Sequence, residues 1–201
     1  MNQILDFLQE LGNIGASHAT TALSHLLADV ELKLTVPRVR ILSFAEAANF
    51  ICSSEDVVVC VYMQIIESIK GNMAFILHLD SALTLANYLT HEQNTNLSEL
   101  QESALLEVGN IMLGSYLTAL SILTNMRIEP SVPVIGIDIM GAIFESILAH
   151  AGITENVTIL ETNFATKRLE LSGHIIFLPD QEIFNSLYQR VSSRLELEEI
   201  S

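Results

Sequence analysis

The chain has few basic residues for its size. Only nine of its 201 residues are Lys or Arg, against 24 Asp and Glu, which gives a formal net charge of −15 and a pI near 4.6. Binding to nucleic acid or to an acidic membrane surface depends largely on Lys and Arg side chains that neutralise phosphates. The composition therefore argues against both, and it favours a protein partner of basic or mixed charge.

Cysteines and long apolar runs are also scarce. Cys52 and Cys60 are the only cysteines, and their spacing fits neither a disulfide framework nor the CxxC pairs of a zinc site. The apolar run 57–63 is far shorter than the ~20 residues that cross a bilayer. Residues 1–6 lack the positive charge of a signal peptide. We expect a soluble, cytoplasmic protein in a reducing compartment, with no membrane insertion.

Several catalytic and metal-binding patterns are missing as well. The six histidines show no HxxH or HExxH spacing, so no metal site is expected. Ser24 and Ser121 lie in no GxSxG turn, which argues against a nucleophilic serine. The segment from Gly12 to Gly15 matches an RNA-binding GxxG loop only as a string, because it falls inside a helical pattern.

What the chain does have is enough apolar sequence for a substantial core, since 50% of its residues are hydrophobic and 16% are charged. Asp80 and Ser98 are expected to cap helices, and Pro37 is expected at a sheet edge or bulge. The periodicity predicts helices at 3–28, 44–51, 80–90, 97–125, 141–151 and 180–195, and strands at 32–43, 57–66, 73–79, 132–140, 157–164 and 169–178.

This order of elements occurs twice. Glu10-Leu-Gly-Asn-Ile14 aligns with Glu107-Val-Gly-Asn-Ile111 at an offset of 97, and Thr-Ala-Leu-Ser recurs downstream at the same offset. We therefore predict one α+β domain over 1–201, made of two αβαββα repeats at 1–93 and 97–201. The expected fold is a six-stranded, mostly antiparallel sheet with the two long helices on one face, related by a pseudo-two-fold axis.

A polar stripe marks each long helix. Positions i, i+4 and i+7 of a helix lie within about 60° of one another, so Asp6, Glu10 and Asn13 share one face. The second repeat places Ser103, Glu107 and Asn110 in the same way. A carboxylate and a carboxamide held together on a stiff helix can grip a charged partner and orient a water molecule.

Two structural readings compete with a functional site at these positions. Glu and Asn are common on solvated helix faces, and Gly12 and Gly109 could recur for packing, with Asn as an internal cap or network residue. The return of Glu, Gly and Asn at identical spacing favours the site. Asp6 is replaced by Ser103, so that position is interpreted as a contact residue and not as a catalytic charge.

The stretches 10–24 and 107–121 closely resemble the CheC family of chemotaxis phosphatases. That family, shared with CheX and FliY, is marked by Asp/Ser-x3-Glu-x2-Asn, and both repeats satisfy this pattern. The resemblance covers essentially the whole chain. Two intact copies are more similar to CheC than to CheX, which carries one, and no C-terminal switch domain of the FliY kind is seen.

The resemblance implies a phosphatase that removes the aspartyl phosphate of a phosphorylated CheY-like response regulator. Glu10 and Glu107 would pair with the regulator's active-site lysine, and Asn13 and Asn110 would orient the attacking water. It implies no cofactor of this chain's own, because the Mg²⁺ would belong to the regulator. CheD is a possible second partner, with the predicted helix 141–151 as the candidate surface. The alternative function is a noncatalytic adaptor that binds a response regulator or CheD.

Overall fold

The computed structural model describes residues 2–26, 33–67, 71–151, 156–165 and 170–179. The helix predicted at 180–195 and the turn predicted near 166–168 lie outside these residues. Along the described chain the order of elements is α1 (Asn2–Leu26), β1 (Lys33–Ser43), α2 (Phe44–Ile51), β2 (Val57–Glu67), β3 (Gly71–His78), α3 (Leu79–Thr90), α4 (Glu99–Thr124), β4 (Glu129–Pro130), β5 (Val134–Ile139), α5 (Met140–Ala151), β6 (Asn156–Ala165) and β7 (Glu170–Pro179).

The two halves of the chain contribute alternately to one sheet. The strand order is β1-β6-β7-β3-β2, with β4 and β5 both paired to the outer side of β2. Every pairing is antiparallel. The first strand of each half therefore lies against the hairpin of the other half, and β3 meets β7 in the middle. This arrangement confirms the predicted α+β fold with its antiparallel sheet.

Prolines account for the irregular strands at the two edges of the sheet. β1 is an edge strand whose register shifts between Thr35 and Arg38, the interval that contains Pro37, as the sequence predicts. The strand expected at 132–140 forms as β5, which begins only at Val134, and the two-residue β4 precedes it outside the expected range. Pro130 and Pro133 lack the amide proton that a continuous ladder needs. β4 is therefore a seventh strand beyond the six expected.

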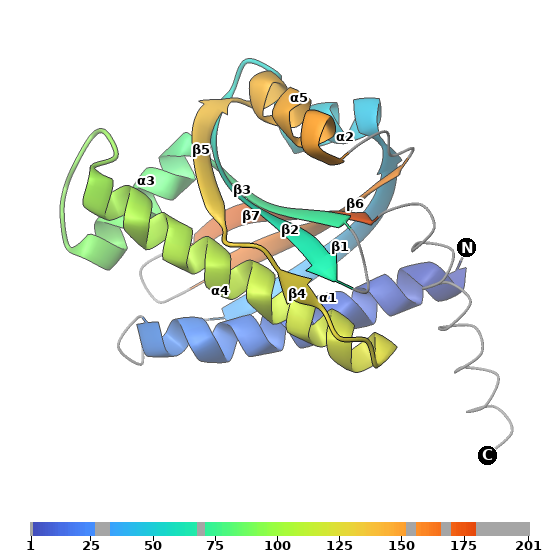
Figure 1. Cartoon of the computed structure of the whole chain (residues 1–201). Helices are drawn as coiled ribbons and strands as arrows, with labels where there is room; N and C mark the ends of the chain where they lie inside the picture. The colour runs from blue at the N-terminus through green and yellow to red at the C-terminus, as the bar shows by residue number, and fades with distance from the viewer. Residues whose placement is uncertain (1, 27–32, 68–70, 152–155, 166–169, 180–201) are drawn as a thin grey trace, which may run out of the picture.

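Helices cover both faces of the curved sheet. Figure 1 shows α1, α3 and α4 on one side and α2 and α5 on the other. The side chains of β2 alternate between the two layers, because Val59 and Val61 enter the core under α1 and α4, while Val58 and Cys60 enter the core under α2 and α5. Burial on both faces explains why β2 is apolar almost throughout.

The two predicted helix caps have different outcomes. Ser98 caps α4 as expected, in a reciprocal capping box with Gln101. Asp80 does not cap α3, because β3 continues to His78 and the helix begins directly afterwards at Leu79. Asp80 consequently lies in the first turn of α3, where the positive end of the helix dipole stabilises its negative charge.

α4 is the central helix of the larger core. Among the described helices it alone is long and apolar enough to span a membrane, with a mean hydropathy of 1.4, but half of its most apolar stretch is buried inside the protein. A search for uninterrupted apolar runs overlooks it, because Glu107 and Asn110 interrupt the pattern. Its contacts with α1, α3 and the sheet account for its composition.

Candidate active site on the two long helices

The two polar stripes lie on helices that pack directly against each other. α1 and α4 run side by side in opposite directions across the same face of the sheet (Figure 1). Gly15 of α1 faces the ring of Tyr116 of α4, and a Cβ atom built at Gly15 would lie only 2.8 Å from Tyr116 Cγ and Cδ1. The close approach of the helix axes therefore depends on a glycine at this crossing point.

The residues of the Glu-x-Gly-Asn sequence are buried and exposed in the same pattern in both helices. Gly12 and Gly109 are buried, whereas Glu10 and Glu107 are exposed. A Cβ atom at Gly109 would lie 2.5 Å from the Cβ of Val61 on β2, so α4 rests on the sheet at this residue. The glycine turns its side of the helix to the core, and the Glu two residues earlier must then face outward.

The asparagines lie beside the glutamates on the outer surface. Asn13 is exposed and Asn110 is partly exposed. Neither side-chain amide hydrogen-bonds to another residue of the described structure, so the described contacts do not make them network residues. Each amide therefore has donor and acceptor positions available to an incoming partner. Asp6 and Ser103 are both exposed one turn earlier on the same stripes.

The structure brings each set of three residues together on its own helix but keeps the two sets apart. Because α1 and α4 run in opposite directions and cross near Gly15 and Tyr116, the stripes lie toward opposite ends of the pair. With a rise of ~1.5 Å per residue, Glu10 and Glu107 are separated by about 20 Å along the helices. Each stripe is therefore a separate contact site.

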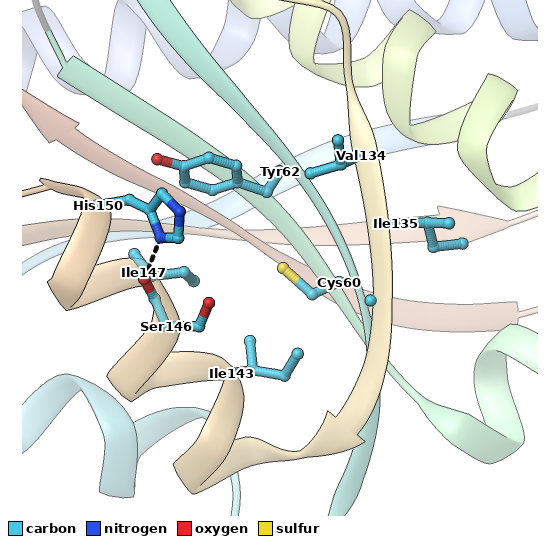
Figure 2. Close-up of a pocket in the computed structure, with 9 residues that line it drawn as sticks. Cys60, Tyr62, Val134, Ile135, Ile143, Ser146, Ile147 and His150 are labelled. Carbon is cyan, nitrogen blue, oxygen red and sulfur yellow. Dashed lines mark hydrogen bonds between the residues drawn. The ribbon is translucent and has the colours of Figure 1, made fainter.

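A cavity lies on the other face of the sheet. It has a volume of about 240 Å³ between β2, β5 and α5 (Figure 2). His150 Nδ1 is 2.7 Å from the carbonyl oxygen of Ser146, and the ring of Tyr62 lies 6.0 Å from that of His150. None of its lining residues belongs to α1 or α4. The lining residues are Cys60, Tyr62, Val134, Ile135, Gly136, Ile143, Ser146, Ile147 and His150.

The position of the stripes limits the chemistry they can perform. Glu10, Asn13 and Glu107 lie on an exposed helical surface, so a reacting group must be brought to them by a partner that supplies the remaining walls of the site. The amino-acid sequence predicts neither this cavity nor the cluster formed by Cys52, Asp56 and His78. The residues of each group come from separate segments of the chain, so no regular spacing in the sequence indicates that they lie together.

The chain is similar to proteins of the CheC-like family. The model of the CheC-like family matches residues 4–41 and 100–137, each of which spans a long helix with its stripe and the strand segment that follows. A Bacillus subtilis relative named CheY-P phosphatase CheC is 32% identical over 199 residues, which are 95% of each chain.

Two solved structures have the same fold. The crystal structure of Thermotoga maritima FliY aligns with a TM-score of 0.76 and 22% identity, covering 94% of this chain and 96% of that one. CheX in the CheX–CheY–BeF3–Mg²⁺ complex from Borrelia burgdorferi aligns with a TM-score of 0.50 and 18% identity, covering 84% and 97%. Because it is 32% identical to the Bacillus relative over nearly the whole length and matches the family model in both halves, the chain belongs to the CheC-like family.

Proposed function

We propose that this protein hydrolyses the aspartyl phosphate of a phosphorylated CheY-type response regulator. The observation that carries the proposal is the duplicated stripe, in which a buried glycine turns a Glu and an Asn outward on each long helix. The relationship to the Bacillus CheY-P phosphatase supports it. A substrate as large as a protein can reach these side chains because they are exposed on the surface of the helices.

Asn13 and Asn110 are assigned to the attacking water. A carboxamide can accept a hydrogen bond from the water through its oxygen and donate one through its nitrogen, and it remains neutral beside a phosphoryl group. The water oxygen forms a bond to phosphorus as the bond to the aspartyl oxygen breaks. Inorganic phosphate and the free aspartate carboxylate of the regulator are the products. Positioning and charge stabilisation supply most of the catalysis in such transfers.

Glu10 and Glu107 are assigned to docking. A carboxylate on the exposed stripe can pair with the active-site lysine of the regulator and fix the angle at which the neighbouring Asn enters. Charge-assisted hydrogen bonds of this kind contribute more than neutral ones once the partner has displaced water. Asp6 and Ser103 contact the regulator one helical turn away and adjust the fit at each site.

The chain itself is proposed to need no cofactor. The Mg²⁺ of the reaction is proposed to be bound by the phosphorylated regulator and not by this chain. We further propose that the reaction takes place in the cytoplasm, where response regulators are phosphorylated. CheD is proposed as a second partner at α5, on the face opposite the stripes.

The alternative, a noncatalytic adaptor, is distinguished by stoichiometry. The regulator is phosphorylated with a small-molecule donor, the donor is removed, and the decay of the phosphorylated form is followed with equimolar protein and with one fiftieth of that amount. A catalyst accelerates the decay of the whole phosphorylated population at both amounts, beyond the spontaneous rate of the regulator alone. An adaptor changes the lifetime only of the fraction that it binds, and this result would contradict the proposal.

A further inference from the structure

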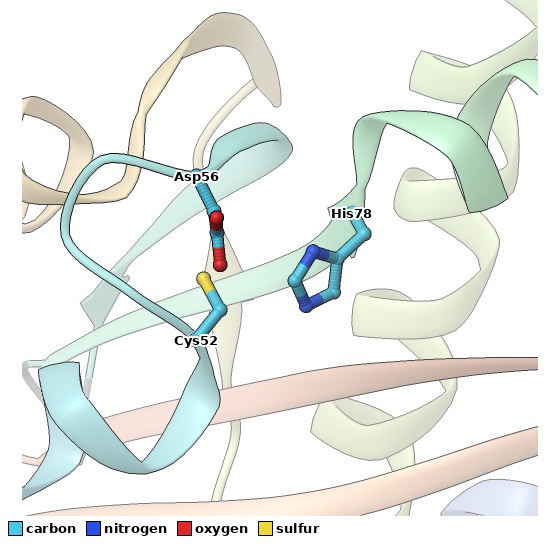
Figure 3. Close-up of side chains that lie close together, drawn as sticks. All are labelled: Cys52, Asp56 and His78. Carbon is cyan, nitrogen blue, oxygen red and sulfur yellow. The ribbon is translucent and has the colours of Figure 1, made fainter.

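We propose that Cys52, Asp56 and His78 form a binding site for a divalent transition-metal ion of the zinc type. Figure 3 shows the three side chains converging from the loop between α2 and β2 and from the junction of β3 with α3. One potential ligand atom from each residue lies within 4.8 Å of the other two. This proposal is independent of the phosphatase function, and it revises the expectation from histidine spacing that the chain has no metal site.

The backbone holds the three residues in place for reasons unrelated to an ion. Cys52 directly follows the last residue of α2 and caps the helix in an extended conformation. The chain then turns, with Asp56 N–H donating to the carbonyl oxygen of Ser53 at 3.1 Å. In the ladder between β2 and β3, Val58 pairs with His78. The loop that precedes β2 is therefore carried toward the end of β3.

Asp56 is oriented for coordination by its own hydrogen bonding. Its Oδ2 atom accepts a hydrogen bond from Ser53 N–H at 2.9 Å, which leaves Oδ1 available. The same loop accepts two hydrogen bonds from the start of α5, one from Met140 N–H to Asp56 O at 2.8 Å and one from Gly141 N–H to Ser54 O at 3.0 Å. Such supporting contacts fix a ligand before the metal arrives.

The ligand types indicate which ion fits. A thiolate, an imidazole and a carboxylate favour Zn²⁺ and its neighbours, whereas Mg²⁺ and Ca²⁺ take oxygen ligands. In a tetrahedral zinc site the ligand atoms are roughly 3.3–3.7 Å apart, so the side chains must approach one another by at most about 1 Å. His78 and Asp56 are exposed and Cys52 is partly exposed, so they can make this adjustment. Water completes the coordination.

Shared folding requirements do not explain the cluster, because the second repeat lacks it. The strand after α5 corresponds to β2, and the repeated Asp80 and Asp180 place Leu178 at the position of His78. The second half contains no cysteine. A repeat that forms the same hairpin without these side chains shows that the hairpin itself does not require them.

The Cys52 thiol does not have the lowered pKa of a reactive cysteine. Burial, and then the charge of Asp56, raises the pKa of the Cys52 thiol above its ordinary value. This shift argues against a nucleophilic cysteine, because the thiolate is the reactive form. A bound cation reverses the effect by stabilising the thiolate, and it releases a proton as it binds. The affinity for the ion should therefore fall as the pH is lowered.

The test is metal binding by the full chain, purified without a histidine tag and stripped with a chelator. Zn²⁺ is titrated by calorimetry, and Co²⁺ is used as a spectroscopic probe of the ligands. We expect one ion per chain, a thiolate-to-Co²⁺ charge-transfer band, and weaker binding at lower pH. Cys52→Ser and His78→Gln should each weaken Zn²⁺ binding by at least about tenfold and remove or shift the cobalt spectrum.

The chain offers a matched control for each ligand. Cys60→Ala removes the other cysteine, which lies in the core beneath α5. His91→Asn removes an exposed histidine at the opposite end of α3 and keeps a residue that tolerates its left-handed backbone. Both controls should bind as the unmodified chain does. Equal Zn²⁺ affinity of that chain and the Cys52→Ser/His78→Gln double variant, or a Co²⁺ complex without thiolate charge transfer, would overturn the proposal.

Discussion

The ring of Tyr116 occupies the space that a side chain at Gly15 would need. A Cβ atom there would lie 2.8 Å from two ring carbons, and only 1% of Tyr116 is exposed. At the offset of the repeat, Gly15 corresponds to Met112 and Tyr116 corresponds to Ala19, and all four residues are buried. The small residues lie on α1 and the large ones on α4, so the interface departs from exact two-fold symmetry.

Gly15→Ala is therefore expected to destabilise the protein. Alanine in a helix interior normally gains up to about 1 kcal/mol over glycine, but overpacking a rigid core costs about 1–3 kcal/mol. We expect a net loss of about 1–2 kcal/mol in the free energy of unfolding, measured by urea denaturation. In a double-mutant cycle, Tyr116→Leu should relieve part of the cost of Gly15→Ala. Additive effects of the two substitutions would contradict the contact.

Gly109 and Gly114, both on α4, give opposite predictions within one helix. Gly109→Ala places a methyl group 2.5 Å from Val61 Cβ, whereas nothing lies within 4 Å of a Cβ at Gly114. Gly109→Ala should lower the free energy of unfolding by at least about 1 kcal/mol, and Gly114→Ala should raise it by up to about 1 kcal/mol. Thermal or urea unfolding of both variants checks the signs. Stabilisation by Gly109→Ala would show that α4 does not rest on β2 there.

The two glutamates are expected to act mainly through binding of the regulator. Removing both charges with Glu10→Gln/Glu107→Gln should raise KM for the phosphorylated regulator about tenfold with a smaller change in kcat. The salt dependence of kcat/KM should also decrease. The control is Glu55→Gln/Glu145→Gln, which changes the net charge equally at exposed positions away from the stripes. An equal effect of the control pair would show that Glu10 and Glu107 act only through the overall charge of the protein, and not through direct contacts with the regulator.

His174 is expected to contribute to the pH dependence of stability. Its pKa is lowered chiefly by burial and further by His78, and the charge of Glu161 offsets part of that effect. The folded state therefore favours the neutral ring. Its contribution to stability is complete above the unfolded pKa of about 6.5 and is lost as the pH falls through that value toward the lower folded pKa.

His174→Gln should make the stability of the protein less sensitive to mild acid. Between about pH 7 and 5, the unfolding free energy of the unmodified chain should fall more steeply than that of the variant, by up to about 1.4 kcal/mol per pH unit. Urea denaturation at several pH values measures both slopes. Parallel slopes would show that His174 titrates alike in the folded and unfolded chain.

Much of the fold could be predicted because its signals are local and repeated. The period of apolar residues located α1 and α4 to within a few residues, and Ser98 gave the start of α4. The extra two-residue strand β4, which lies before the strand predicted at 132–140, and the direct passage from His78 into α3 were not predictable. Both depend on how neighbouring strands pair, which local periodicity does not encode.

The candidate site could be located for a similar reason. Glu10 and Asn13 share a helical spacing that returns at Glu107 and Asn110, so one periodicity and one repeat were enough to find them. The contact of Gly15 with Tyr116 and the cluster around Cys52 carry no such signal. They join segments that are distant in sequence, and only the packed structure brings them together.

The most direct test of the central claim is phosphate release from a phosphorylated CheY-like regulator by four forms of the protein: unmodified, Asn13→Ala, Asn110→Ala and the double variant. Thr21→Ala and Thr118→Ala are controls at exposed, equivalent positions of the same helices. Each single variant should retain the activity of its intact site, and the double variant should lose about 100-fold or more of the acceleration while remaining folded and able to bind the regulator. Undiminished turnover by the folded double variant would contradict the assignment of Asn13 and Asn110 as the water-orienting groups.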